Sequence, residues 1–274
     1  MLGLSRSGYY KWLHKKISSR KSKRLFLLDK IKRIHKESRF LYGSPRIHAK
    51  LQSLGYFCSR KLISSVMREN NISSIIRKSY KKTTNSRHNN EISPNVLIGY
   101  GNINSPYEIW VSDITYVRTS KGWLYLTTVL DLFTRKIVGY SMSNDMKVES
   151  TVLKAFDCAV LKSGGIYPKI FHSDRGVQYS SKLFRKKLQS AGITQSMSST
   201  GNCYDNAFAE SFFKTIKSEL IYLNSFKCLN DAKTAIFEYI ECFYNKKRIH
   251  SGIGYKTPNE MQDEYYLKKY DESA

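Results

Sequence analysis

Three carboxylates lie in sequence contexts that suit metal-assisted chemistry. Asp113 lies in an apolar, β-branched run, Asp174 directly follows a second short apolar run, and Glu210 lies in a segment with helical spacing. Acidic residues are scarce, 22 against 46 lysines and arginines. One such residue would usually be a helix cap or a salt-bridge partner. Three that converge would form a cage of hard oxygen ligands, of the kind that holds two Mg²⁺ ions for phosphoryl transfer.

The elements that must position these acids follow from hydrophobic periodicity. The pattern predicts a meander of three strands, then alternating helices and strands, and two closing helices. The expected strands are 110–117, 124–130, 136–142, 170–173 and 194–196, and the expected helices are 148–161, 180–191, 205–220 (capped by Asp205 or Asn206) and 229–244. This order predicts an α/β ribonuclease H-like integrase catalytic core, a mixed five-stranded sheet with flanking helices on both faces.

Such a fold would bring the three acids together. Asp113 would lie on the first strand and Asp174 at the carboxyl end of the fourth. Glu210 would project from a helix packed beside them. Open sheets place their sites at strand ends of this kind, so we expect the catalytic site there.

The first third of the chain is strongly basic. Residues 1–99 carry 23 lysines and arginines against 4 acidic residues, whereas residues 100–274 carry 23 against 18. This asymmetry favours a nucleic-acid-binding module ahead of a catalytic domain. A basic disordered or membrane-surface tail is the alternative, and an AT-rich genome would also raise the lysine count.

Three short helices are expected in this basic region, the first over 25–40 with Leu25, Leu28, Ile31 and Ile34 at three-residue steps. Ser44 and Pro45 predict the start of the second, whose buried stripe would be Ile47, Leu51 and Leu54 and which Gly55 would end. Ser59 would cap the third, with Leu62, Val66 and Ile63 facing inward. This pattern suits a small all-α helix-turn-helix domain, although a plain helical bundle would give the same spacing. The candidate DNA contacts here are Arg46, Arg60, Lys61 and Arg68.

Further candidate contacts lie near the acids. Lys214 and Lys217 share the helix face of Glu210 and could hold phosphates, or could form surface Glu–Lys pairs. Arg248 and His250 follow a basic run and could touch phosphates, or could be solvated. We expect Asn206 to cap a helix, and His172, on the strand that leads to Asp174, to have a core or supporting role.

The domain organisation follows from these patterns. A stretch poor in apolar residues separates the helical region from the first strand and is expected to be a flexible basic linker. The expected divisions are a basic segment 1–24, a helix-turn-helix-like domain 25–76, a basic linker 77–105, a catalytic core 106–262 and a C-terminal tail 263–274.

Composition also excludes several classes of protein. No apolar run approaches the roughly 20 residues that span a bilayer, and the N-terminus is too polar for a signal peptide. The five cysteines are scattered without a CxxC pair, which argues against a zinc module and fits a reducing cytoplasm. We therefore expect a cytoplasmic protein without a membrane partner.

Several motifs resemble one known family. The chain is similar to the second-frame (OrfB) part of transposases of the insertion-sequence-three family, within the retroviral-integrase-like superfamily named for its Asp, Asp and Glu residues (DDE). The matching stretches are Trp-Val-Ser-Asp-Ile-Thr-Tyr at 110–116, His-Ser-Asp-Arg-Gly-Val-Gln-Tyr at 172–179, Gly-Asn-Cys-Tyr-Asp-Asn-Ala-Phe-Ala-Glu-Ser-Phe-Phe at 201–213, Tyr-Asn-Lys-Lys-Arg-Ile-His-Ser at 244–251 and Tyr-Gly-Ser-Pro-Arg-Ile at 42–47.

The resemblance implies a function. It implies that Asp113, Asp174 and Glu210 are the catalytic and metal-binding triad, with two Mg²⁺ or Mn²⁺ ions as cofactor. The expected activity is DNA strand cleavage and strand transfer during transposition of a bacterial insertion sequence. The expected partners are double-stranded DNA, at the terminal inverted repeats of the element and at the target, and further copies of the chain on that DNA.

Two departures from the family pattern bear on this expectation. The usual Ser-x-Leu-Gly-Tyr is Ser-Gly-Ile-Gly-Tyr at 251–255. The family's functional enzyme is usually a frameshift fusion with an upstream helix-turn-helix and coiled coil, which makes the first-frame product a candidate partner. The alternative functions are a DNA-binding regulator or inhibitor with an inert acidic site, and a structure-specific nuclease on the same fold.

We expect a fragment of residues 1–98 to bind DNA chiefly through phosphate charge. The logarithm of its affinity should fall by about 0.9 per phosphate contact for each unit of log salt. Footprinting on element ends and on scrambled DNA would measure both affinity and sequence preference. Equal affinity for the two would make this module a nonspecific clamp, and no binding at low salt would assign its basic charge to genome composition.

Overall fold

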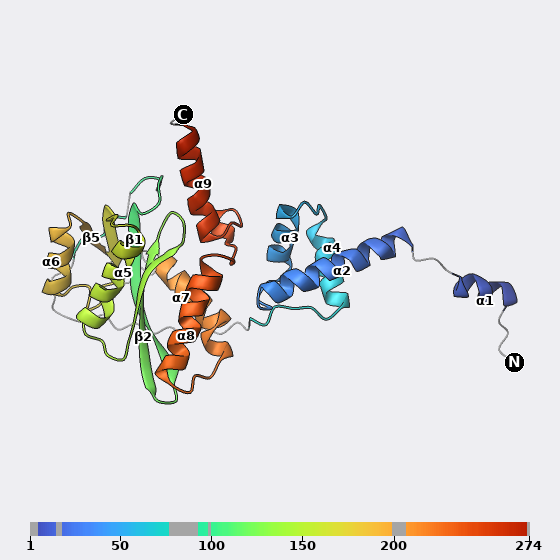
Figure 1. Cartoon of the computed structure of the whole chain (residues 1–274), viewed down its shortest axis with the longest axis horizontal. Coiled ribbons are helices and arrows are strands. Elements are labelled where there is room, and N and C mark those ends of the chain that lie inside the picture. Colours follow the sequence, from blue (N-terminus) through green and yellow to red (C-terminus); the bar gives the residue numbers. More distant parts are fainter. Residues whose placement is uncertain (1–4, 15–17, 77–92, 98–99, 199–206, 273–274) are drawn as a thin grey trace. The chain divides into compact units, whose positions relative to one another are not determined.

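The computed structural model describes residues 5–14, 18–76, 93–97, 100–198 and 207–272 (Figure 1). The chain divides into two compact units, Met1–Ile75 and Ile76–Ala274. Each unit is considered by itself. Across the described residues, none of the helices is both long enough and apolar enough to cross a membrane.

The first unit is helical. Its helices α1 to α4 begin at Ser or Gly caps, and the side chains of Ser5, Ser18 and Ser59 accept backbone N–H groups at the starts of α1, α2 and α4. The helices are α1 (Arg6–Leu13), α2 (Ser19–Glu37), α3 (Ser44–Ser53) and α4 (Arg60–Glu69). Helices α2, α3 and α4 pack on one another around a core of buried aliphatic side chains, which includes Leu27, Ile31, Ile47, Leu51, Ile63 and Val66.

Several details of this unit differ from expectation. Gly43, not Ser44, is the N-cap of α3, and it makes no side-chain cap bond. Leu54 is 48% exposed because α3 ends at Ser53, so the buried stripe stops at Leu51. The predicted boundary between the basic segment 1–24 and the helix-turn-helix-like domain 25–76 falls inside α2, because that helix begins at Ser19, after its N-cap Ser18.

The buried face of α2 also lies elsewhere than predicted. Leu27, Ile31 and Ile34 are buried, whereas Leu25 is 48% exposed. Steps of three residues fall short of the 3.6-residue helical turn, so a strict three-residue repeat drifts around the helix. The buried face therefore follows steps of four and three.

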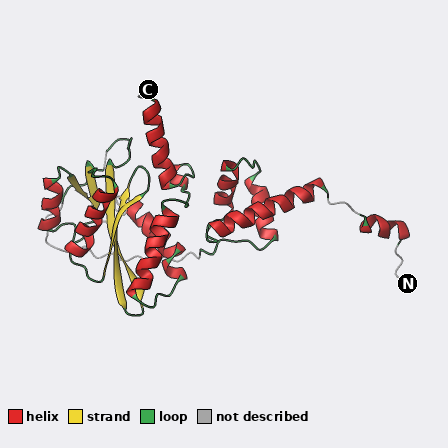
Figure 2. Ribbon diagram, in the orientation of Figure 1, coloured by secondary structure: helices red, strands yellow, loops and turns green. Residues whose placement is uncertain are grey.

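The second unit is built on a mixed five-stranded sheet with the strand order β3-β2-β1-β4-β5 (Figure 2). Its strands are β1 (Ile109–Thr119), β2 (Gly122–Asp131), β3 (Ile137–Ser143), β4 (Ile170–Ser173) and β5 (Thr194–Met197). Strands β1, β2 and β3 form the antiparallel meander, and β4 and β5 join it in parallel. The expected ribonuclease H-like fold is confirmed.

Helices cover both faces of this sheet (Figure 1). One face carries η1 (Glu149–Leu153), α5 (Lys154–Lys162) and α6 (Lys182–Ser190), whose Phe156 and Phe184 join Trp110 and Phe171 in one core cluster. The other carries α7 (Ala207–Glu219) and α8 (Leu229–Glu238). Gly139 on β3 permits close packing of α5, because a Cβ there would lie 2.4 Å from the Ala155 carbonyl oxygen.

The closing part of the chain departs from the predicted pattern. The first turns of the helix expected over 148–161 and the last turns of that expected over 229–244 are π-helical, as η1 and η3 (Tyr239–Tyr244). Two short 3₁₀ turns, η2 (Ile221–Leu223) and η4 (Ser251–Ile253), were not expected. The predicted boundary at 262 falls inside α9 (Pro258–Asp271), which a capping box of Thr257 and Glu260 initiates.

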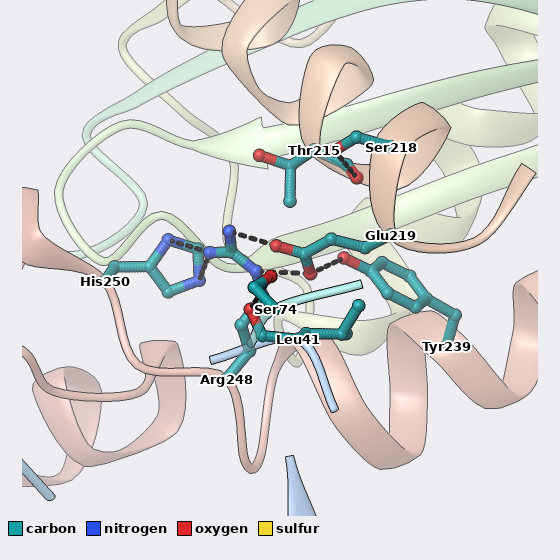
Figure 3. Close-up of polar contacts among 8 residues, drawn as sticks. All are labelled: Leu41, Ser74, Thr215, Ser218, Glu219, Tyr239, Arg248 and His250. Carbon is teal, nitrogen blue, oxygen red and sulfur yellow. Dashed lines mark hydrogen bonds and ion pairs between the residues drawn. The ribbon is translucent and has the colours of Figure 1, made fainter. Parts of the chain in front are cut away.

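A buried ion pair ties α7 to the segment that follows η3 (Figure 3). The Arg248 guanidinium donates from Nε and Nη2 to the two oxygens of Glu219, at 2.8 and 2.7 Å, and Tyr239 donates its hydroxyl to the same carboxylate at 2.8 Å. The side chains of Arg248 and Glu219 are only 4% and 2% exposed. The expectation that Arg248 contacts DNA phosphates is therefore wrong, because its charge is buried and engaged by Glu219.

We expect Arg248→Met alone to lower the free energy of unfolding by about 3–5 kcal/mol, because it leaves the Glu219 carboxylate buried without its cation. Adding Glu219→Met and Tyr239→Phe should recover most of that loss, since no unpaired charge or hydroxyl would remain. Denaturant unfolding of the two variants would measure this. Equal destabilisation by the single and triple changes would contradict this account.

Candidate active site

The pairing of β1 with β4 brings two of the predicted acids together. These strands run parallel, with Val111 opposite His172 and Ser112 opposite Ser173. Asp113 and Asp174 are the residues that follow Ser112 and Ser173, at the point where the pairing of the two strands ends. Neighbouring strands lie about 4.8 Å apart, so the two carboxylates leave adjacent backbone positions.

Each aspartate is oriented by a backbone N–H group. Asp113 accepts from Ile114 N at 2.7 Å, and Asp174 accepts from Gly176 N at 2.9 Å. A Cβ at position 176 would lie 2.9 Å from the same Asp174 oxygen, so a larger residue there would push against the carboxylate. The glycine in the Asp-Arg-Gly sequence thus leaves room for the Asp174 side chain.

Helix α7 presents Glu210 on its polar side. Glu210, Lys214 and Lys217 lie at i, i+4 and i+7, whereas Phe212 and Ile216 lie on the buried side. The helix packs against β1, which carries Asp113. Lys214 is exposed and Lys217 is half-buried, and the Lys217 ammonium lies 5.8 Å from the centre of the Tyr116 ring on β1. Glu210 and Lys217 therefore face the edge of β1.

The electrostatics of Asp113 link all three acids. Burial of its carboxyl raises its pKa well above the ordinary value, and the negative charges of Asp174 and Glu210 raise it further. The Ile114 N–H group and the Lys217 ammonium act in the opposite direction. The fold thus holds like charges close together, at a cost that a bound cation would relieve.

A buried tyrosine connects the two aspartate-bearing segments. The Tyr179 hydroxyl and the Ser112 hydroxyl form a hydrogen bond of 2.7 Å, and both residues are buried. Burial raises the pKa of Tyr179, and the charges of Asp113 and Asp174 raise it further. Ser112 precedes Asp113 directly, and Tyr179 belongs to the loop after Asp174, so this bond fixes the two segments against each other. No individual role was predicted for Tyr179 from the sequence.

The other predicted residues lie in varied settings. His172 is buried, with Nδ1 2.9 Å from Oγ of Ser196 on β5 and Nε2 3.3 Å from Oγ of Ser198 just beyond β5, which fits its predicted core or supporting role. The guanidinium of Arg46 lies 5.5 Å from the centre of the Tyr42 ring. Arg60, Lys61 and Arg68 are exposed on α4. Asp205 and Asn206 lie outside the described residues.

The chemistry of the donors suits a hard divalent cation, since all three acids offer carboxylate oxygens. Within the ranges that the structure describes, however, no three His, Cys, Asp or Glu side chains are grouped closely enough to hold a metal ion as they stand. Asp113 and Asp174 lie on adjacent strand positions.

The fold and the acid-bearing strands define an integrase-type ribonuclease H-like core, and comparisons with known proteins identify its family. Two integrase core domain families match residues 103–203 and 191–258, and an HTH-like domain family matches residues 22–80. The chain belongs to the insertion-sequence-three family of transposases, as the following relatives show.

Relatives match over almost the whole chain. A transposase for insertion sequence element IS904 of Lactococcus lactis is 36% identical over 91% of this chain and 98% of that protein. Transposase InsF for insertion sequence IS3A of Escherichia coli is 32% identical over 96% of this chain and 92% of that protein. An uncharacterized 31 kDa protein of insertion element IS600 of Shigella sonnei is 37% identical over 97% of each chain.

Similar structures match the sheet-containing unit with low identity. The HTLV-2 integrase catalytic core domain in complex with magnesium is 20% identical, covers 58% of this chain and 97% of its own, and gives a TM-score of 0.43.

We expect Asp113→Asn to raise the melting temperature in the presence of a metal chelator, because it removes a partly buried carboxylate that the neighbouring acids repel. The rise should be about 2–4 °C for each kcal/mol of repulsion relieved. Asp131→Asn is the matched control. Asp131 is fully buried, and it accepts from Tyr107 N, Thr134 N and Thr134 Oγ1, so its replacement should lower the melting temperature. A loss of stability in both variants would contradict the repulsion at Asp113.

Proposed function

We propose that this chain is a metal-dependent transposase that cleaves DNA strands at the ends of its element and joins them to target DNA. The observation that carries the proposal is the adjacency of Asp113 and Asp174 at the end of the β1–β4 pairing, with Glu210 close enough to raise the pKa of Asp113. Integrase core families match this part of the chain.

Each residue of the site has a proposed role. Asp113, Asp174 and Glu210 would hold two Mg²⁺ or Mn²⁺ ions through their carboxylates. Bound there, the ions would activate water or a 3′-hydroxyl and stabilise the leaving oxygen. Lys217, whose charge opposes the rise in the pKa of Asp113, would hold a phosphate of the DNA strand near the acids. Lys214, exposed on the same face of α7, would hold a neighbouring phosphate.

The first unit would bind DNA through α4. Arg60, Lys61 and Arg68 are exposed on this helix, at spacings that place them on one side. Glu69, the acid at the end of α4, accepts hydrogen bonds from Ser65 and from Arg24 of α2. These two bonds lower the pKa of Glu69, and the Arg24 charge offsets the Glu69 charge beside these cations. We propose that α4 enters a DNA groove and that Arg46 of α3 contacts the sugar-phosphate backbone of the DNA. Copies of the chain would assemble on the two ends of the element, with the first-frame product as a further partner.

The decisive experiment is incubation of the protein with labelled element-end DNA, target DNA and Mn²⁺. Cleavage followed by strand-transfer products, without a covalent protein–DNA intermediate, is the expected result. Asp113→Asn and Asp174→Asn should each reduce the products at least a hundredfold, while DNA binding in the chelator should persist. Asp131→Asn, assayed below its melting temperature, is the control for a buried aspartate outside the site.

Other outcomes would identify a different function. Cleavage without preference for the element end would indicate a structure-specific nuclease. Binding without chemistry would indicate a regulator whose acidic site is inert. Full activity of Asp113→Asn would remove that residue from the catalytic site.

A further inference from the structure

An exposed aromatic pair lies on the β1–β2 hairpin near the acids. Tyr116 and Trp123 are 47% and 46% exposed, and their ring centroids lie 5.2 Å apart in an edge-to-face arrangement. Trp123 is opposite Arg118 in the strand pairing, and Tyr116 is opposite Tyr125, so the two rings are diagonal neighbours on one face of the hairpin. Neighbouring large aromatic side chains that are exposed to solvent indicate a candidate binding surface.

The charges around this pair specify an anionic partner. Arg118 and Lys121 are exposed on the same hairpin, and the Lys217 ammonium lies 5.8 Å from the centre of the Tyr116 ring. Lys227 follows Phe226, whose carbonyl accepts from Ser120 N at the hairpin turn. The acid just beyond the end of β3, Asp145, is engaged within the chain, because its carboxylate accepts hydrogen bonds from the Ser150 hydroxyl and from Lys147 N. Exposed rings set among cations are how proteins bind unpaired nucleotides, with bases on the rings and phosphates on the cations.

The position relative to the acids is the second line of evidence. Tyr116 lies three residues beyond Asp113 on β1, about 10 Å along the strand. The two side chains leave opposite faces of the sheet, but β4 pairs with β1 only as far as Ser112. Beyond Ser112 the edge of β1 is therefore not paired with β4. Lys217 lies at this edge, because its ammonium is 5.8 Å from the centre of the Tyr116 ring and its charge also influences the Asp113 carboxyl. A DNA strand that crosses this edge could place one phosphodiester at the acids and a nearby base on the rings.

We propose that Tyr116 and Trp123 form a stacking site for an unpaired base of the DNA strand that lies in the active site. The proposal rests on the proposed function, because it takes DNA as the occupant of the neighbouring acidic site. It adds a binding site for single-stranded DNA next to the acids, separate from the duplex contacts proposed for α4. Opening of the duplex near the reacting phosphate would expose such a base, and stacking would repay part of the cost of unpairing it.

A simpler role for the pair is stabilisation of the hairpin by cross-strand contact. That role predicts a loss of stability in Trp123→Leu without any change in the preference between DNA ligands. The two roles are therefore distinguished by binding of DNA probes that differ only in an unpaired base. Trp123→Phe keeps an aromatic face and should retain most of the binding.

The test uses the full chain in a chelator, so that binding is measured without chemistry. The probes are a hairpin duplex with a single-stranded thymidine tail, and the same duplex with an abasic tail. Wild type should prefer the thymidine tail, and Trp123→Leu should lose that preference, with tail affinity reduced about 5- to 150-fold. Tyr270→Leu, which removes a ring that is 75% exposed on α9, is the matched control and should bind like wild type.

A spectroscopic measurement makes the contact direct. The chain has three tryptophans, of which Trp110 is buried and Trp12 is 70% exposed. In a Trp12→Phe background, the thymidine tail should quench the fluorescence of Trp123, and the abasic tail should not. Equal quenching by both tails, or a wild-type preference retained in Trp123→Leu, would overturn the proposal.

Two further outcomes are informative. If Trp123→Leu changes the sedimentation of the protein without DNA and leaves the tail preference intact, a second copy of the chain covers this face and the proposal is wrong. If strand transfer fails in wild type while the tail preference depends on Trp123, the proposed activity fails and the stacking site stands.

Discussion

The site depends on where the pairing between β1 and β4 stops. Parallel pairing through Ser112 and Ser173 fixes the backbone positions of Asp113 and Asp174 side by side. Had β4 continued along β1, its backbone would have occupied the edge that α7 approaches. The short strand therefore does two things: it aligns two carboxylates, and it leaves the edge of β1 beyond them to helix α7. The Ser112–Tyr179 hydrogen bond holds both acid-bearing segments at this point.

Helix α7 completes the site from one side and is anchored from the other. Glu210 and Glu219 are nine residues apart, which at 100° per residue places them on opposite sides of the helix. Glu219 continues the buried stripe of Phe212 and Ile216, and it is tolerated there because Arg248 and Tyr239 satisfy it. The same residue type thus serves two purposes, and neighbouring side chains decide which. A rotation of α7 that moved Glu210 would also break the buried ion pair.

Much of this arrangement was predictable from sequence, because it rests on local pattern. Strand and helix order, and the strand contexts of Asp113 and Asp174, follow from periodicity that each segment carries by itself. Arg248 was assigned wrongly because it follows Lys246 and Lys247, which resemble a surface, whereas its partner Glu219 lies 29 residues away. The bond of Tyr179 to Ser112 spans 67 residues. Such pairings depend on tertiary packing, and no local signal in either segment reveals them. The inward face of α2 was predicted wrongly because a strict three-residue repeat drifts around a helix of 3.6 residues per turn, and the π-helical turns were not predicted.

Two aspartates of the sheet, Asp113 and the fully buried Asp131, differ in how the chain surrounds their carboxylates. Asp131 receives three hydrogen bonds from Tyr107 and Thr134, which offset part of the rise in its pKa that burial causes. Asp113 receives one, from Ile114, and has Asp174 and Glu210 as neighbours. Neutralising Asp113 is expected to stabilise the fold, but under the proposed function it would also remove a charge that attracts the cation. An acidic cluster inside a chain of net charge +24 is therefore a local exception to the electrostatics of the whole molecule. The lysines and arginines suit a polyanionic strand, and the neighbouring carboxylates suit the cation that would act on it.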